Sequence, residues 1–190
     1  MLNVEVSFLA EQFNAYLLRR TGSTTLGRVV PGNVVDETGK LAIASGSVGL
    51  ALVNIEEERV MREQAPARVM VRGREMTLQP EIRLNLTLLF VARMANYDMT
   101  LKALSNVLTF FQANPAFSAE DYPALDARIG KLVMELHSVG PETLNQLWAA
   151  IGAKYQPSVL YRARLVTIQD QEPLSFGEPI TDIGLEVHEK

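Results

Sequence analysis

The sequence predicts an α+β domain in which a single mixed or mainly antiparallel sheet is packed by about three helices. Some segments alternate apolar and polar residues, as half-buried strands do, whereas others carry an apolar stripe at helical spacing. Because each kind of segment must bury one side, helices layered on a sheet satisfy both. A chain of 190 residues suits one such domain, which we expect at residues 1–168, followed by an extended tail at 169–190.

Residues 81–115 contain the strongest strand pattern and the strongest helix pattern. From residue 82 to 90, apolar residues alternate with Arg83, Asn85 and Thr87, and after Thr87 both faces become apolar. A strand that changes in this way enters the middle of the protein, where both sides of the sheet are covered.

A helix is predicted over residues 98–112. Asp98 can cap its first turn, and the helix ends before Pro115 because the residue preceding a proline is pushed out of helical geometry. The residues at helical spacing that form its apolar stripe are Leu101, Leu104, Val107, Leu108 and Phe111.

Two further helices and four further strands are predicted. The helix at residues 4–20 has Phe8 and Leu18 outside its apolar stripe, and these two side chains either contact another subunit or pack on a following loop. The other helix begins at Pro141, a residue that suits the first helical position, and runs over 141–151. The strands are expected at residues 26–30, 48–60, 131–137 and 158–168.

Alternation within residues 48–60 predicts two faces for that strand. One face is expected to hold Leu50, Leu52 and, as a further candidate, Asn54, and the other Ala51, Val53 and Ile55.

The same strand ends in the acidic run Glu56, Glu57 and Glu58, which Arg59 follows. Three adjacent carboxylates are a conceivable site for a divalent cation. However, adjacent residues on a strand point to opposite faces, so these carboxylates do not converge without a special turn. We therefore favour a solvated strand end or a charged interface patch over a metal site.

Residues 64–79 form a polar insertion between two core strands. Residues 68–71 and 75–78 can pair as a hairpin, or the insertion can be an arm with little structure of its own. A long insertion between core strands is often a binding element. The charged residues that we regard as interface candidates are Glu56, Glu57, Glu58, Arg59, Arg62, Arg72 and Arg74.

Composition excludes several classes of function. The net charge is −4 with both signs interspersed and no basic run, which argues against nucleic acid as the main partner. The chain has no cysteine, so disulfides and thiolate metal sites are excluded. We find neither a signal-peptide pattern nor the roughly 18 consecutive apolar residues of a membrane span, so we expect a cytoplasmic protein with no membrane partner.

No catalytic arrangement is evident, and we expect neither enzyme activity nor a cofactor. His137 and His188 lack metal-ligand spacing, and residues 46–49 (GSVG) lack the spacing and lysine of a phosphate loop. Trp148 lies on the apolar stripe of its helix, which favours core packing over ligand stacking.

Four segments resemble one family, the N-terminal domain of the cap, or tail-terminator, protein of phage-tail-like contractile injection systems, with the Photorhabdus virulence cassettes and antifeeding prophages as type examples. Residues 53–59 (VNIEEER) and 84–90 (LNLTLLF) resemble its "VNIEEER" and "LNLYLLF" blocks. Residues 101–115 resemble its "LS…FFQ.NP" helix end, and the longest match, residues 144–161 (LNQLWAAIGAKYQPSVLY), resembles its "LN.LW..LG.KY.PSVLY" block.

The resemblance implies a structural protein without an active site. Such proteins form a ring, expected to be hexameric, that closes the distal end of the inner tube and anchors the last sheath layer. The partners implied are further copies of the chain, the inner tube protein and the sheath protein, in a particle assembled in the cytoplasm and then released. The alternative interpretation is a stand-alone α+β binding module or a small enzyme on a similar fold.

Overall fold

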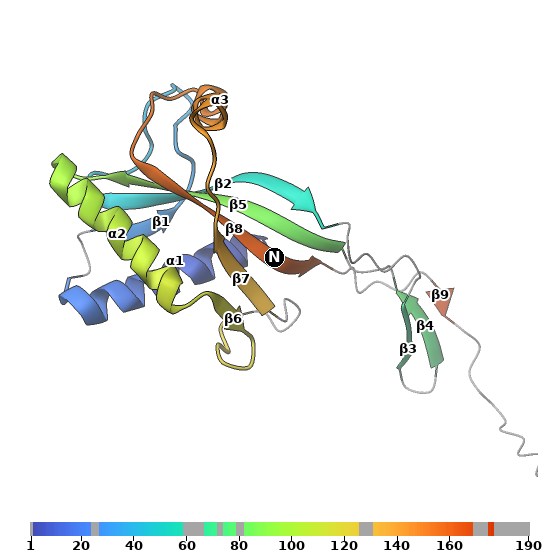
Figure 1. Ribbon diagram of the computed structural model, residues 1–190. Coiled ribbons are helices and arrows are strands. Elements are labelled where there is room, and N and C mark those ends of the chain that lie inside the picture. The colour runs from blue at the N-terminus through green and yellow to red at the C-terminus, as the bar shows by residue number, and fades with distance from the viewer. Residues whose placement is uncertain are drawn as a thin grey trace, which may run out of the picture.

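The computed structural model describes residues 2–23, 27–58, 67–71, 74–78, 82–125, 131–168 and 175–176. Its main body is one curled six-stranded sheet with helices on both faces (Figure 1). The helices are α1 (Leu2–Thr21), α2 (Tyr97–Ala113) and α3 (Pro141–Ile151). The strands of the main sheet are β1 (Arg28–Pro31), β2 (Ser47–Glu57), β5 (Ile82–Arg93), β6 (Ala116–Ser118), β7 (Lys131–Leu136) and β8 (Ser158–Ile168).

The strand order is β1-β2-β5-β8-β7-β6. β1 pairs with β2 in parallel, whereas every other neighbouring pair is antiparallel. The sheet is therefore mixed, and the predicted α+β class is confirmed. β5 lies inside the sheet between β2 and β8, and its residues from Asn85 to Ala92 are all buried, as expected for a strand covered on both faces.

Helices α1 and α2 cover one face of the sheet (Figure 1). The core between them is rich in aromatic rings. Phe110 of α2 meets Phe13 of α1 edge to face at 5.5 Å, and Phe111 packs against Phe90 of β5 at the same centroid distance. Offset and edge-to-face contacts of this kind stabilise a core beyond the burial of area alone.

The predicted stripe of α2 was wrong at Leu101, which is 44% exposed. Thr100 is buried in its place and donates its hydroxyl to the backbone oxygen of Asn96. The residues of α2 that enter the core are Thr100, Ala103, Leu104, Val107, Phe110 and Phe111, with Leu108 packed at the margin.

The predicted cap of α2 was also wrong. Asn96 is the N-cap: its backbone is extended, and its side-chain oxygen accepts a hydrogen bond of 2.9 Å from the amide of Met99. Asp98 lies inside the first turn, so it cannot occupy the cap position, and it forms an exposed ion pair of 2.7 Å with Lys102.

Of the two alternatives for Phe8, packing within the chain is correct. Phe8 is buried, and its ring contacts Phe117 of β6 at 5.5 Å and Tyr122 in the following loop at 5.8 Å. Leu18 remains exposed.

A β-bulge in β2 changes the faces predicted for that strand. The register to β5 shifts between Leu52 and Asn54, so Asn54 lies opposite Thr87 and Ile55 opposite Leu86. Asn54 therefore shares the face of Ala51, and Ile55 shares the face of Leu52, the reverse of the prediction. Alternation alone cannot detect this, because a bulge inserts one residue and inverts every later side chain.

The other face of the sheet is covered by α3 and the segment before β2. Trp148 of α3 is buried with Val34, Ile43 and Leu89, which confirms its predicted place in the core. Pro141 begins this helix, and Gly152 ends it in the left-handed conformation at φ 76° that glycine accepts without strain.

The insertion between β2 and β5 contains the predicted hairpin, formed by β3 (Ala67–Val71) and β4 (Arg74–Leu78). Two pairings were not predicted. β9 (Ser175–Phe176), from the expected tail, joins β4 to make a separate three-stranded sheet. The short strand β6, for which no strand was predicted, pairs with β7. Figure 1 shows the small sheet beyond the ends of β2, β5 and β8, away from the helices.

Candidate assembly interface

The sheet face that α3 covers becomes polar toward the end of β2 and the beginning of β5, which lie side by side because the two strands are antiparallel. On this face of β5, Val91 and Leu89 pack beneath α3. Thr87 and Asn85, nearer the beginning of β5, lie on the same face. Asn54 and Glu56 lie beside them on β2, and Arg162 lies opposite Thr87 on β8.

Two groups of ion pairs, which we together call the charged network, connect β2, β8 and β7 on this face. Glu56, near the end of β2, pairs with Arg162 of β8 at 3.5 Å, and Glu58, directly after β2, pairs with Arg164 at 3.7 Å. Arg164 also reaches Glu135 of β7 at 3.1 Å. These contacts bridge β5, which lies between β2 and β8.

Amide side chains complete the network. Asn54 donates to Glu56 at 2.9 Å, and Asn85 donates to Glu58 at 3.1 Å. Two buried polar atoms, Oδ1 of Asn85 and Nε of Arg162, have no hydrogen-bond partner within the described parts of the chain. Because the carboxylates and guanidinium groups are largely half-exposed, the network contributes little to stability and leaves charge available at the surface.

The predicted interface residues are distributed over more than one surface. Glu56 and Glu58 belong to the network, whereas Glu57 lies opposite Leu84 and points to the other face of the sheet. Arg74 is the first residue of β4, and Arg59, Arg62 and Arg72 lie outside the described residues. Within the described ranges, no group of three or more His, Cys, Asp or Glu side chains is placed to hold a metal ion.

Arg162 and Arg164, the basic residues of the network, were not among the predicted interface residues. Arg162 and Arg164 are two residues apart on one strand, as Glu56 and Glu58 are on another. Two acidic residues on one strand and two basic residues on another, both at a spacing of two, are a signal that could have predicted ion pairs between the strands. The strand order that brings β2 and β8 to either side of β5 was not readable from the patterns.

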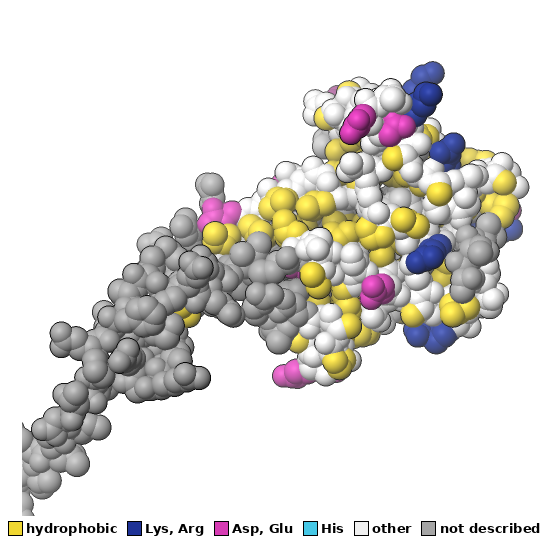
Figure 2. Space-filling view, turned by 180° about the vertical axis from the view of Figure 1, so that it is seen from behind, with side chains coloured by type: hydrophobic (Ala, Val, Ile, Leu, Met, Phe, Trp, Pro, Cys, Tyr) yellow, Lys and Arg dark blue, Asp and Glu magenta, His cyan; other side chains and the backbone are white. Residues whose placement is uncertain are grey.

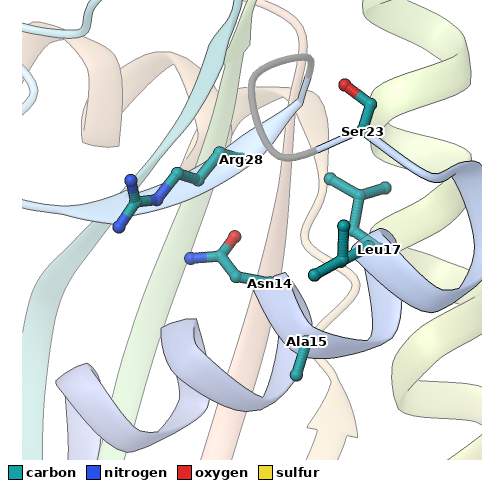
Figure 3. A pocket seen from close by; sticks show the side chains of 6 residues that line it. Asn14, Ala15, Leu17, Ser23 and Arg28 are labelled. Atoms are coloured by element: carbon teal, nitrogen blue, oxygen red, sulfur yellow. The ribbon is translucent and has the colours of Figure 1, made fainter.

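A separate hollow of about 310 Å³ lies between α1 and the beginning of β1 (Figure 3). In Figure 3 the amide of Asn14 points from α1 toward β1. This amide bonds both backbone groups of Val29, donating to its oxygen at 2.9 Å and accepting from its nitrogen at 2.8 Å. Asn14 therefore occupies hydrogen-bonding positions on the outer edge of β1 that another strand would otherwise use.

The lining of this hollow offers no obvious chemistry. Its residues are Asn14, Ala15, Leu17, Leu18, Ser23 and Arg28. They include no histidine, cysteine or carboxylate that could serve as a base or nucleophile partner.

Among the helices of the described chain, none is both long and apolar enough to cross a membrane.

Comparison with known proteins places this fold. The family model described as the Pvc16 N-terminal domain matches residues 6–182. The fold is similar to the sheath/tube terminator of the PVC extracellular contractile injection system in its extended state, with a TM-score of 0.61 and 14% identity. It is also similar to the tube-terminating cap of the anti-feeding prophage, with a TM-score of 0.62 and 14% identity.

These two structures are longer than the chain described above. The matches cover 96% and 98% of this chain but only 62% and 61% of the two structures. No curated protein matches the chain.

Proposed function

The chain belongs to the Pvc16 N-terminal domain family, and from this we propose that it is the structural cap, or tail terminator, of a contractile injection system. The family match over residues 6–182 is the observation that carries the proposal. The shared fold supports it, because the two similar structures are a sheath/tube terminator and a tube-terminating cap.

In this proposal the protein acts by binding, without catalysis or a cofactor. Its partners are further copies of itself in a ring of six, the inner tube protein and the sheath protein, and assembly takes place in the cytoplasm before the particle is released. The ring closes the distal end of the tube and anchors the last sheath layer.

The physical need for a terminator follows from the symmetry of a tube. Each tube ring offers the same surface to the next ring, so head-to-tail stacking has no intrinsic stop. A cap ends growth if one of its faces matches the tube and the opposite face does not.

We propose that residues 1–168 form the domain and that residues 169–190 form an extended tail. We further propose that the charged candidates act at the contacts between subunits. The half-exposed carboxylates of Glu56 and Glu135 support this assignment. Charges of this kind affect partner choice and register more than affinity.

Deletion of the gene from a producing strain tests the function. We expect inner tubes of irregular length and poorly attached sheath, while the tube protein itself is still made. Re-expression of the full chain should restore uniform particles. Uniform tubes with attached sheath in the deletion strain would rule out the terminator function.

A second strain tests whether the hairpin of β3 and β4, which we call the arm, contributes to the contacts that the cap makes. It carries a chain in which residues 67–78 are replaced by a short Gly/Ser linker, and we expect a folded protein that no longer caps. A chain with a similar linker inserted in the exposed turn at Thr38 is the control for the insertion. If the shortened chain caps normally, the arm is not part of the contacts, whereas the proposed function stands.

A further inference from the structure

The outer edge of β2 is only partly covered. β1 pairs with β2 from Ser47 to Leu50, and the amide of Gly32 then donates to the oxygen of Leu50 at 3.0 Å. β2 continues to Glu57, yet no described strand pairs with its outer edge beyond Leu50. The bulge at Val53 follows directly, so the run from Asn54 to Glu56 begins where pairing with β1 has already ended.

This open run has the properties of a strand-pairing template. Ile55 is 47% exposed and the side chain of Glu56 is 46% exposed. Figure 2 shows hydrophobic side chains gathered on this side of the molecule, with acidic side chains at the margin next to the grey atoms. An unpaired edge that carries an exposed β-branched residue readily accepts another strand.

The small sheet has a second open edge of opposite charge. Its order is β3-β4-β9, so β3 is an end strand, and no described strand pairs with its outer side. The β3 sequence ARVMV contains Arg68 and no proline, and Arg72 and Arg74 follow it. Proline would prevent pairing by removing a backbone donor, so its absence leaves β3 competent to pair.

We propose that β3 of one copy adds to the open edge of β2 in a neighbouring copy, so that the main sheet of one subunit continues into the arm of the next. This inference rests on the proposed ring and deepens it. The hairpin of β3 and β4, whose sequence includes Arg68 and Arg74, then lies near the acidic end of β2. Backbone hydrogen bonds supply the attachment, as in other cases of strand addition, and the opposite charges select the edge.

These observations favour a second copy of the chain as the partner that pairs with the open edge of β2. The two edges are different surfaces of one chain, and contacts between two different surfaces close into a ring when the rotation permits. Within its own copy the hairpin lies beyond the ends of the main sheet rather than along β2 (Figure 1).

Cysteine cross-linking tests the pairing directly, because the chain has no native cysteine. The double variant Ile55→Cys/Val69→Cys, oxidised in the full-length protein, should give a ladder of covalent oligomers. Neighbouring pairs, with cysteine at Asn54 or Glu56 and at Arg68 or Met70, identify the register. The matched control combines Val69→Cys with Tyr97→Cys, an exposed position on α2, and should give no ladder.

Charge exchange provides the second measurement. Glu56→Arg and Arg68→Glu should each weaken oligomer formation on the order of tenfold, and the double variant should recover it. A mixture of the two single variants should also assemble, since each copy then meets a neighbour of opposite charge. Circular dichroism verifies that every variant remains folded.

The oligomeric state measured in the same samples distinguishes the possible outcomes. A ladder at one register together with recovery in the charge exchange supports the pairing. Rings that form without any ladder overturn the pairing but leave the cap function intact. A monomer that gives no ladder, yet binds tube ends in the presence of tube protein, also overturns the pairing. Failure to form rings and failure to bind tube ends would together contradict the proposed function itself.

Discussion

Arg162 in β8 and Glu56 in β2 form an ion pair of 3.5 Å across β5, the strand that separates them. Both side chains are partly exposed, at 32% and 46%. Solvent therefore screens their attraction, and we expect a coupling below about 1 kcal/mol.

A double-mutant cycle with Arg162→Met and Glu56→Gln, followed by urea unfolding, measures this coupling. The exposed pair of Asp98 and Lys102 on α2 provides a reference cycle for a fully solvated contact. A coupling above about 2 kcal/mol would mean that the network is a buried stabilising element rather than surface charge available to a partner.

Val107 and Leu101 lie on the same helix but differ completely in burial. Val107 is fully buried, whereas Leu101 is 44% exposed. Val107→Asp would place an unpaired charge in the core and should destabilise the fold by several kcal/mol, on the order expected for a buried charge without a partner. Leu101→Asp is the matched control and should cost less than about 1 kcal/mol. Equal melting temperatures for the two variants would contradict the orientation of α2.

Asn96 is predicted to stabilise α2 through its side chain. Asn96→Ala removes the hydrogen bond to the amide of Met99 and should cost about 1 kcal/mol. Asp98→Ala removes only an exposed pair with Lys102 and should cost about 0.5 kcal/mol or less. Chemical denaturation of both variants measures the difference, and a larger loss for Asp98→Ala would reverse the cap assignment.

Asn14 is predicted to hold the edge strand β1 against α1. Asn14→Ala leaves both backbone groups of Val29 without their partner and should cost about 1–3 kcal/mol. Hydrogen exchange at the amide of Val29 should accelerate at the same time. Asn145→Ala makes the same chemical change at an exposed position of α3 and should have little effect. Unchanged exchange at Val29 in Asn14→Ala would show that water replaces the side chain without loss.

The period of two in β5 and the stripes of the helices were sufficient to predict the fold class, because burial on one side imposes those periods directly. The hairpin of β3 and β4 was also readable, from two short strands on either side of Arg72 and Gly73. The face of the sheet on which Asn54 lies could not be predicted from the sequence. The bulge beside Asn54 inverts the alternation, and no feature of the composition marks it.

Long-range pairing limited prediction most. β9 pairs with β4 although it lies about a hundred residues further along the chain. Arg162 contacts Glu56 because the strand order places β2 and β8 on either side of β5. The choice between Asn96 and Asp98 as the cap depended on a boundary shift of two residues, which is within the usual uncertainty of helix ends.

The location of the protein in intact particles tests the central claim most directly. Particles purified from a strain that expresses the full chain with a small C-terminal tag should be imaged by cryo-electron microscopy after labelling of the tag. We predict one ring of label at a single end of the particle, at the end of the inner tube distal to the baseplate. Label along the length of the sheath, label at the baseplate, or particles without label would contradict the assignment as a cap.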